Sequence, residues 1–88
     1  MSERAERIRA ALQQLEPAEL NLIDESHKHA GHEGARDGRG HYRVRIVSPQ
    51  FAGRAPLARH RLIYAALGDL MHTDIHALAI DAQAPHEH

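Results

Sequence analysis

The chain has 88 residues, no cysteine, and only three large aromatic side chains, two tyrosines and one phenylalanine. This length predicts a single domain with a small aliphatic core and argues against a large buried catalytic cleft. The lack of cysteine excludes disulfides and thiolate-ligated metal sites within the chain. The net charge is −1, but residues 28–61 carry +6 between two acidic segments. Such a segment could attract anions, or acidic neighbours in the fold could neutralise it.

Neither the hydropathy nor the N-terminus suggests a membrane or export signal. No apolar run approaches the roughly 20 residues of a membrane span. The first stretch, MSERAERIRAALQQL, is amphipathic but lacks the apolar run of a signal peptide, and it contains Glu3 and Glu6, which a transit peptide would avoid. We therefore expect a cytoplasmic protein without membrane contact.

The first half of the chain predicts one helix and two strands. Ser2 can cap the start of a helix, and Pro17 prevents this helix from continuing. The apolar residues of this helix share one face: Ala5, Ile8, Leu12 and Leu15. ELNLIDES then predicts a strand with Leu20 and Leu22 on one face.

The middle of the chain predicts a long loop followed by a strand. Residues 27–40 contain four glycines and no aliphatic side chain larger than alanine. Loops of this length between strands are often functional. HYRVRIVS alternates, which predicts a strand with Tyr42, Val44 and Ile46 on one face and polar residues on the other.

The second half predicts a turn, a helix and a last strand. QFAGRA is typical of a turn, and Pro56 suits the start of a helix of about fifteen residues, closed by Thr73 and Asp74. IHALAIDA predicts an interior strand, because both of its faces are fairly apolar. Its alternation places His76 on the same face as Leu78 and Ile80. QAPHEH is expected to be a frayed polar tail, so we expect one domain over residues 1–82 and a tail over 83–88.

The order of these elements predicts an α+β fold. The long loop would join the first two strands antiparallel, and the second helix would cross over to a parallel third strand. Two helices would cover one face of a three-stranded mixed sheet.

Nine histidines are the most unusual feature of the composition. His27, His29 and His32 lie in the glycine-rich loop. A closed structural zinc site needs four ligands, usually including thiolates. These three imidazoles are therefore either a polar loop or part of a metal site that another molecule completes.

The other histidines allow mainly local interpretations. His41 opens the polar face of its strand, His60 lies four residues before Tyr64 on one helical face, and His72 suits the negative end of a helix. His76 lies in an apolar strand, so it must be hydrogen-bonded or partly open to solvent. We assign no role to the two tail histidines, His86 and His88.

Four stretches together resemble the BolA family, from about residue 3 to residue 82. They are DESHKHAGHEG, HYRVRIVSPQFAG, PLARHRLIYAAL and IHALAI. The combination of F-x-G, R-H-R and H-A-L at these intervals is specific. The resemblance implies an α+β fold like the class II KH domain, in agreement with the element order. Because the chain has no cysteine, it resembles the histidine-type, bacterial-like members.

The resemblance also implies a partner and a cofactor. Such proteins pair with monothiol glutaredoxins, and the pair can hold a bridging [2Fe–2S] cluster whose thiolates come from the glutaredoxin and a glutathione. The matching ligands here are His76 and His29, with His27 and His32 as alternates. Imidazole can replace thiolate on one iron of such a cluster. The isolated chain is expected to carry no cofactor and to be a monomer or a weak homodimer.

A second implication is DNA binding, because some bacterial members are described as stress- and morphology-linked transcriptional regulators. The candidate surface is FAGRAPLARHR, with Arg54, Arg59 and Arg61 around a helix start. The slightly negative net charge and the lack of an aromatic platform argue against it. The same arginines could instead face an acidic patch on a glutaredoxin. No nucleophile, catalytic triad or phosphate loop is visible, so we expect no enzyme.

Overall fold

The computed structural model describes residues 3–26 and 40–87. The expected cap Ser2 and most of the predicted loop, residues 27–39, lie outside these ranges. The elements in chain order are α1 (Glu3–Leu12), η1 (Gln13–Leu15), β1 (Glu19–Asp24), β2 (Gly40–Val47), η3 (Pro49–Phe51), α3 (Pro56–Leu67), α4 (Leu70–Thr73) and β3 (Ile75–Gln83).

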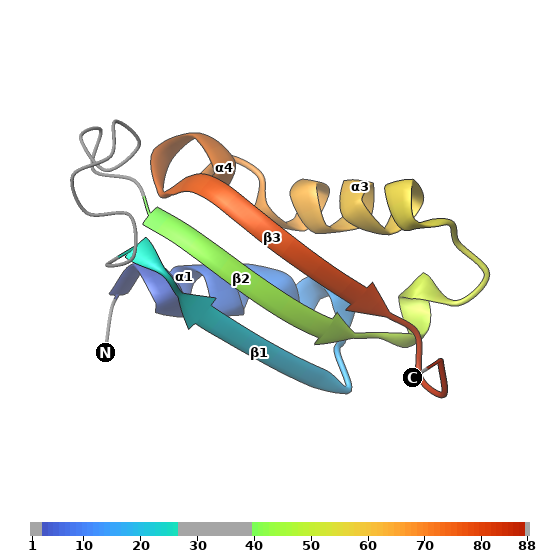
Figure 1. The fold of residues 1–88 in the computed structure, drawn as a ribbon. Helices are drawn as coiled ribbons and strands as arrows, with labels where there is room; N and C mark the ends of the chain where they lie inside the picture. The colour runs from blue at the N-terminus through green and yellow to red at the C-terminus, as the bar shows by residue number, and fades with distance from the viewer. Residues whose placement is uncertain (1–2, 27–39, 88) are drawn as a thin grey trace.

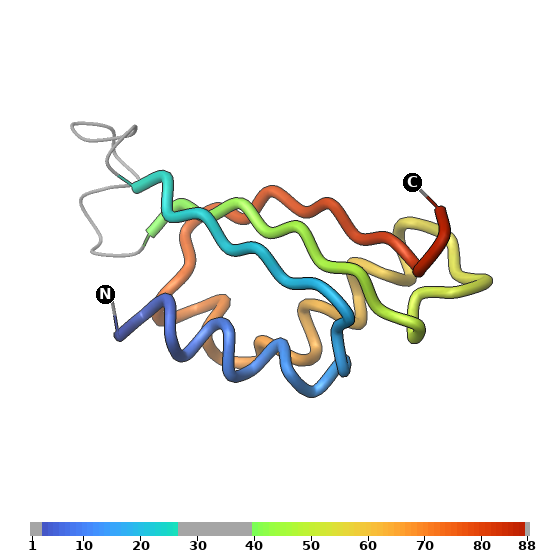
Figure 2. Tube along the Cα trace, turned by 90° about the horizontal axis from the view of Figure 1, so that it is seen from below, coloured from blue at the N-terminus to red at the C-terminus, as the bar shows by residue number. Residues whose placement is uncertain are grey.

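The three strands form one mixed sheet in the order β1-β2-β3. β1 pairs antiparallel with β2, and β2 pairs parallel with β3. Helices α1 and α3 lie on the same face of this sheet, and no helix of the described residues covers the other face (Figures 1 and 2). The predicted α+β class, the strand directions and the one-sided helical layer are all confirmed. Among the described residues, no helix is long and apolar enough to cross a membrane.

The core lies between the sheet and the helices and follows the predicted periodicity. All four apolar residues of the first helical face are buried, as are Tyr42, Val44 and Ile46 of β2. Leu20 and Leu22 of β1 pack against this core. Spacing predicted these faces correctly because the geometry of a regular element alone sets which residues share a side.

β3 is an edge strand, so the prediction of an interior strand is wrong. Its one partner in the described sheet is β2, and β2 is the central strand. Ala77 and Ala79, which suggested a second buried face, are exposed on the side without helices. Alanine is small enough to tolerate exposure there, so an apolar composition did not require burial.

The predicted single helix is divided into α3 and α4. α3 ends at Gly68, whose φ is +54° and whose N–H donates to the Tyr64 carbonyl. Such a φ is strained for any residue with a side chain, so glycine ends the helix here. After this turn, α4 leads the chain back to the start of β3.

Two segments expected to be irregular contribute to the packed structure. Within the predicted turn, Phe51 ends η3 and is completely buried. In the predicted frayed tail, Gln83 still belongs to β3, Ala84 is 3% exposed, and Glu87 forms a bidentate ion pair with Arg59 at 2.6 and 2.7 Å. The tail is therefore held against α3 up to residue 87.

Candidate functional site

His76 lies at the start of β3 and is exposed. The parallel register pairs Gly40 with Ile75 but His41 with Ala77, so β3 has one extra residue at this point. This bulge points Ile75 into the core, where it is 1% exposed. The expectation that His76 shares a face with Leu78 and Ile80 is wrong, because a bulge shifts the alternation by one residue.

The bulge brings His76 next to His41 of β2. The centroids of the two imidazole rings are 5.1 Å apart, and the ring planes are tilted by 47°. His41 is half-buried, and its main chain is bonded to the segment that follows β1. Its N–H donates to Ser26 Oγ at 3.0 Å, and its carbonyl accepts from Glu25 N–H at 2.7 Å. One imidazole of the pair is thus placed by the central strand and the other by an edge strand.

Gly40 is the point where three chain segments meet beside this pair. Its N–H donates to the Asp74 carbonyl at 2.9 Å. A Cβ at this position would lie 2.6 Å from Tyr42 Cε2 and 2.8 Å from Ser26 Oγ. The ring of Tyr42 and the hydroxyl of Ser26 therefore leave no room for a side chain at this position, which favours glycine.

Asp74 attaches the start of β3 to α1. Its carboxylate accepts two bonds from Arg7, at 2.6 and 3.0 Å, and one from Thr73 Oγ1 at 2.8 Å. Arg4 lies 4.0 Å away. Burial raises the pKa of Asp74, but the bonds from Arg7 and Thr73 and the charges of Arg7 and Arg4 outweigh it, so the pKa is lowered.

Replacing Asp74 with asparagine should lower the free energy of unfolding at pH 7 by about 1–3 kcal/mol, because the arginine bonds are charge-assisted. A lowered folded pKa stabilises the fold above the unfolded value of about 3.9, and this contribution disappears as pH falls through the folded value. The deficit of the variant should therefore shrink below about pH 4, as measured by urea unfolding across pH. The matched control Asp81→Asn, in an exposed pair with Arg45 at 3.7 Å, should change stability by less than about 0.5 kcal/mol. An equal deficit at pH 7 and pH 3 would contradict the role of the Asp74 charge.

The loop histidines His27, His29 and His32 lie outside the described residues. The two described residues that flank this segment, Ser26 and Gly40, both lie at the candidate site: Ser26 binds His41, and Gly40 pairs with Ile75. Among residues 3–26 and 40–87, no group of three or more histidine, aspartate and glutamate side chains could hold a metal ion.

Of the five described arginines in the basic middle segment, three face acidic partners. On the helix-free face, Arg43 pairs with Glu25 at 3.3 Å and Arg45 with Glu19 at 3.1 Å. These acids precede the basic segment in the sequence, and β1–β2 pairing brings them together. On this face, acidic neighbours in the fold therefore neutralise the basic segment, which was one of the two alternatives for its charge.

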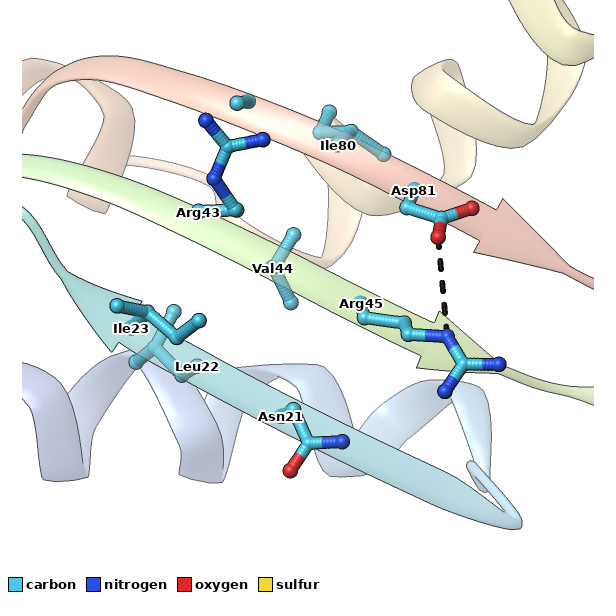
Figure 3. A pocket seen from close by; sticks show the side chains of 9 residues that line it. Asn21, Leu22, Ile23, Arg43, Val44, Arg45, Ile80 and Asp81 are labelled. Atoms are coloured by element: carbon cyan, nitrogen blue, oxygen red, sulfur yellow. Dashed lines mark ion pairs between the residues drawn. The ribbon is translucent and has the colours of Figure 1, made fainter.

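The same face is hollowed beside these arginines. The hollow has a volume of about 400 Å³, and Arg43, Arg45, Ile23 and Asp81 are among its lining residues. Figure 3 shows the side chains of all three strands around it, with the ion pair between Arg45 and Asp81 at one end. Ile23 is 50% exposed here.

The three arginines proposed for nucleic acid differ in their availability. Arg59 is held by Glu87 and also donates to the Ala82 carbonyl at 3.1 Å. Arg54 and Arg61 are exposed, and neither has an ion pair within the described part of the chain. The predicted cluster is therefore two exposed arginines and one that is already engaged.

Two further histidines lie away from the His41–His76 pair. His60 makes an edge-to-face contact with Tyr64, at a centroid distance of 6.5 Å, as their spacing predicted. His72 is exposed in the last turn of α4, in agreement with the predicted position at a helix end.

Comparison with known proteins agrees with this architecture. The family model BolA, described as BolA-like protein, matches residues 12–87. The BolA domain of SufE1 from Arabidopsis thaliana has a TM-score of 0.86 and 42% identity, covering 100% of this chain and 99% of that one. This small α+β domain therefore belongs to the BolA-like protein family.

Full-length relatives place the same domain in different settings. SufE-like protein 1, chloroplastic/mitochondrial, from A. thaliana is 43% identical over 93 residues, which cover 99% of this chain but only 25% of that protein. The DNA-binding transcriptional regulator BolA of Escherichia coli is 40% identical over 75 residues, covering 85% of this chain and 66% of the regulator. This chain thus spans a quarter of the first relative and about two thirds of the second.

Sequence reasoning missed three residues that build the site. His41 was interpreted only as a surface residue, Gly40 as part of a loop, and Asp74 as the end of a helix. The parallel register between β2 and β3, with its bulge, brings them together. No local spacing encodes that register, so within one sequence the only available signal was the apolar Ile75 directly before His76.

Proposed function

We propose that this chain is a regulatory and iron–sulfur trafficking module that pairs with a monothiol glutaredoxin and shares a bridging [2Fe–2S] cluster with it. The observation that carries the proposal is the exposed imidazole of His76 at the start of β3. Ser26 and Gly40, the two described residues that flank the segment with the loop histidines, lie at the same site. We propose a binding module rather than an enzyme.

The donor set of the chain suits half of such a cluster. Imidazole nitrogens can hold one iron of a [2Fe–2S] centre, as in Rieske proteins, where they raise the reduction potential. The chain contains no cysteine, so the thiolates for the other iron must come from the glutaredoxin and a glutathione. The role of this chain is to present imidazole at an exposed edge that a partner can approach.

The second ligand from this chain is proposed to be His29. It is three residues after Ser26, so its Cα lies within roughly 11 Å of the Ser26 Cα by chain length alone. Ser26 in turn binds the strand residue next to His76. His27 and His32, one and six residues after Ser26 in the sequence, are the alternates. The family resemblance favours His29 over both.

Replacing His76 with alanine should weaken the affinity for the shared cluster by at least about tenfold. Losses of this size follow even when a residue that only hydrogen-bonds to a metal ligand is replaced. The protein would be mixed anaerobically with a monothiol glutaredoxin, iron, sulfide and glutathione, and followed by absorption and visible circular dichroism. His72→Ala, which removes an exposed imidazole from α4, is the matched control and should leave the spectrum unchanged. An unchanged spectrum with His76→Ala would remove the ligand role.

DNA binding is the second candidate function, and the E. coli relative named as a DNA-binding transcriptional regulator favours it. Arg54 and Arg61, exposed around the Pro56 start of α3, are the proposed phosphate contacts. The third arginine, Arg59, would first have to leave Glu87.

If this chain binds duplex DNA, the double variant Arg54→Ala/Arg61→Ala should flatten the slope of log K against log salt by about 1.8, since each phosphate contact contributes about 0.9. The measurement is a fluorescence anisotropy titration at several salt concentrations. Arg9→Ala, on α1 and paired with Glu6, is the control and should leave the slope unchanged. No measurable affinity of the unmodified chain at physiological salt would reject this second function.

A further inference from the structure

The spacing of the His41 and His76 rings is compatible with chelation of one metal ion. Metal–nitrogen bonds of about 2.0–2.1 Å at a tetrahedral angle place the centroids of two imidazoles on one ion roughly 5 Å apart. The observed centroid separation is 5.1 Å. The ring planes are tilted by 47°, so the two rings are not stacked face to face.

We propose that His41 and His76 form a two-imidazole half-site that binds a divalent first-row metal ion on the chain alone. Imidazole is a preferred ligand of Zn²⁺, Ni²⁺ and Cu²⁺, and water would complete the coordination. This site does not depend on a glutaredoxin, and it makes His41 a metal ligand in addition to those proposed above.

The backbone around both residues is preorganised for this role. The main chain of His41 is bonded to Glu25 and Ser26, and β2 holds it between two neighbouring strands. The Gly40–Asp74 bond and the bulge set the start of β3, from which His76 projects. Two ligands on rigid elements bind more tightly than two that must first be ordered, because less conformational entropy is lost.

The pair also lies where a metal ion could enter. The ion would approach from the side of His76, which is exposed, because the Nε2 atom of His41 is buried on the face of β2 opposite the helices (Figure 2). A tilted contact between two aromatic rings would have the same centroid distance without any metal. Metal binding by the pair is therefore the property to test.

The test is a zinc titration of the isolated chain, followed by NMR of the ¹⁵N-labelled imidazole groups. Zn²⁺ is diamagnetic, and the signals of His41 and His76 should shift together, with one shared dissociation constant. His41→Ala should weaken the zinc-induced shift of His76 by about tenfold or more, because a single imidazole loses the advantage of chelation. His60→Ala is the control and should leave both shifts unchanged.

The reciprocal variant protects the test against a folding defect. His41 is half-buried, so its replacement could disturb β2, whereas the exposed His76 can be replaced without opening the core. His76→Ala should abolish the zinc-induced shift of His41. Zinc shifts confined to the other histidines, or a His41 shift that survives in His76→Ala, would overturn the proposal. Neither result would bear on cluster sharing with a glutaredoxin, which is measured in the mixed complex.

Discussion

Phe51→Ala should lower the free energy of unfolding by about 3–5 kcal/mol, the usual cost of removing a fully buried phenylalanine. Phe51 is completely buried, and among the described residues it shares a mostly aliphatic core with one other aromatic side chain, Tyr42. A domain of this size has only about 5–15 kcal/mol of stability, so the variant should be partly unfolded near 37 °C. Urea unfolding followed by far-ultraviolet circular dichroism measures the change.

Leu57→Ala is the matched control for this experiment. Leu57 is 62% exposed at the start of α3, so its truncation should change stability by less than about 0.5 kcal/mol. A loss below about 1.5 kcal/mol for Phe51→Ala would mean that the cavity collapses and that η3 is not a support of the core.

Gly40→Ala should cost about 1–3 kcal/mol and should disturb the histidine pair. The new Cβ would lie 2.6 Å from the Tyr42 ring, which is 2% exposed and has no space to retreat. Overpacking of this kind moves backbone as well as side chains. The segment that must move carries the bond to Asp74, directly before Ile75 and His76. Urea unfolding and the imidazole NMR signals of His41 and His76 test the two effects.

Gly53→Ala separates a general loss of stability from a change at the site. Its φ of +74° makes a side chain unfavourable by about 1 kcal/mol, but no atom lies within 4 Å of the added Cβ. We expect Gly53→Ala to lower the free energy of unfolding as well, but to leave the imidazole signals of His41 and His76 unchanged. If Gly40→Ala leaves those signals unchanged too, the close approach at Gly40 does not position His76.

Both predictions concern residues whose importance is invisible in the local sequence pattern. Phe51 stands in a stretch with a proline and a glycine that is typical of a turn, and Gly40 ends a glycine-rich stretch. The packing of Phe51 into the core and the crowding of Gly40 by Tyr42 and Ser26 give these two residues their structural roles. In contrast, Ala5, Ile8 and Leu12 were correctly placed because α1 is regular along its length.

The charges illustrate the same division. The sequence separates a basic middle segment from acidic flanks, which suggested an anion-binding surface. In the fold, β1 brings Glu19 and Glu25 beside Arg45 and Arg43, and the C-terminal turn brings Glu87 to Arg59. Among the described arginines of the basic segment, Arg54 and Arg61 are left for a nucleic acid or an acidic partner.

The sequence by itself determined the α+β class, the order of the elements along the chain, the directions in which the strands pair, the core-facing sides of α1, β1 and β2, and the family. These properties follow from periodicity and from motifs that lie within continuous stretches. Only the tertiary structure decided that β3 is an edge strand, that His76 faces outward, and that His41 lies 5.1 Å from it. The physical reason is that strand order, register and a bulge depend on which distant segments pair, and a shift of one residue turns a side chain from the core to the open face.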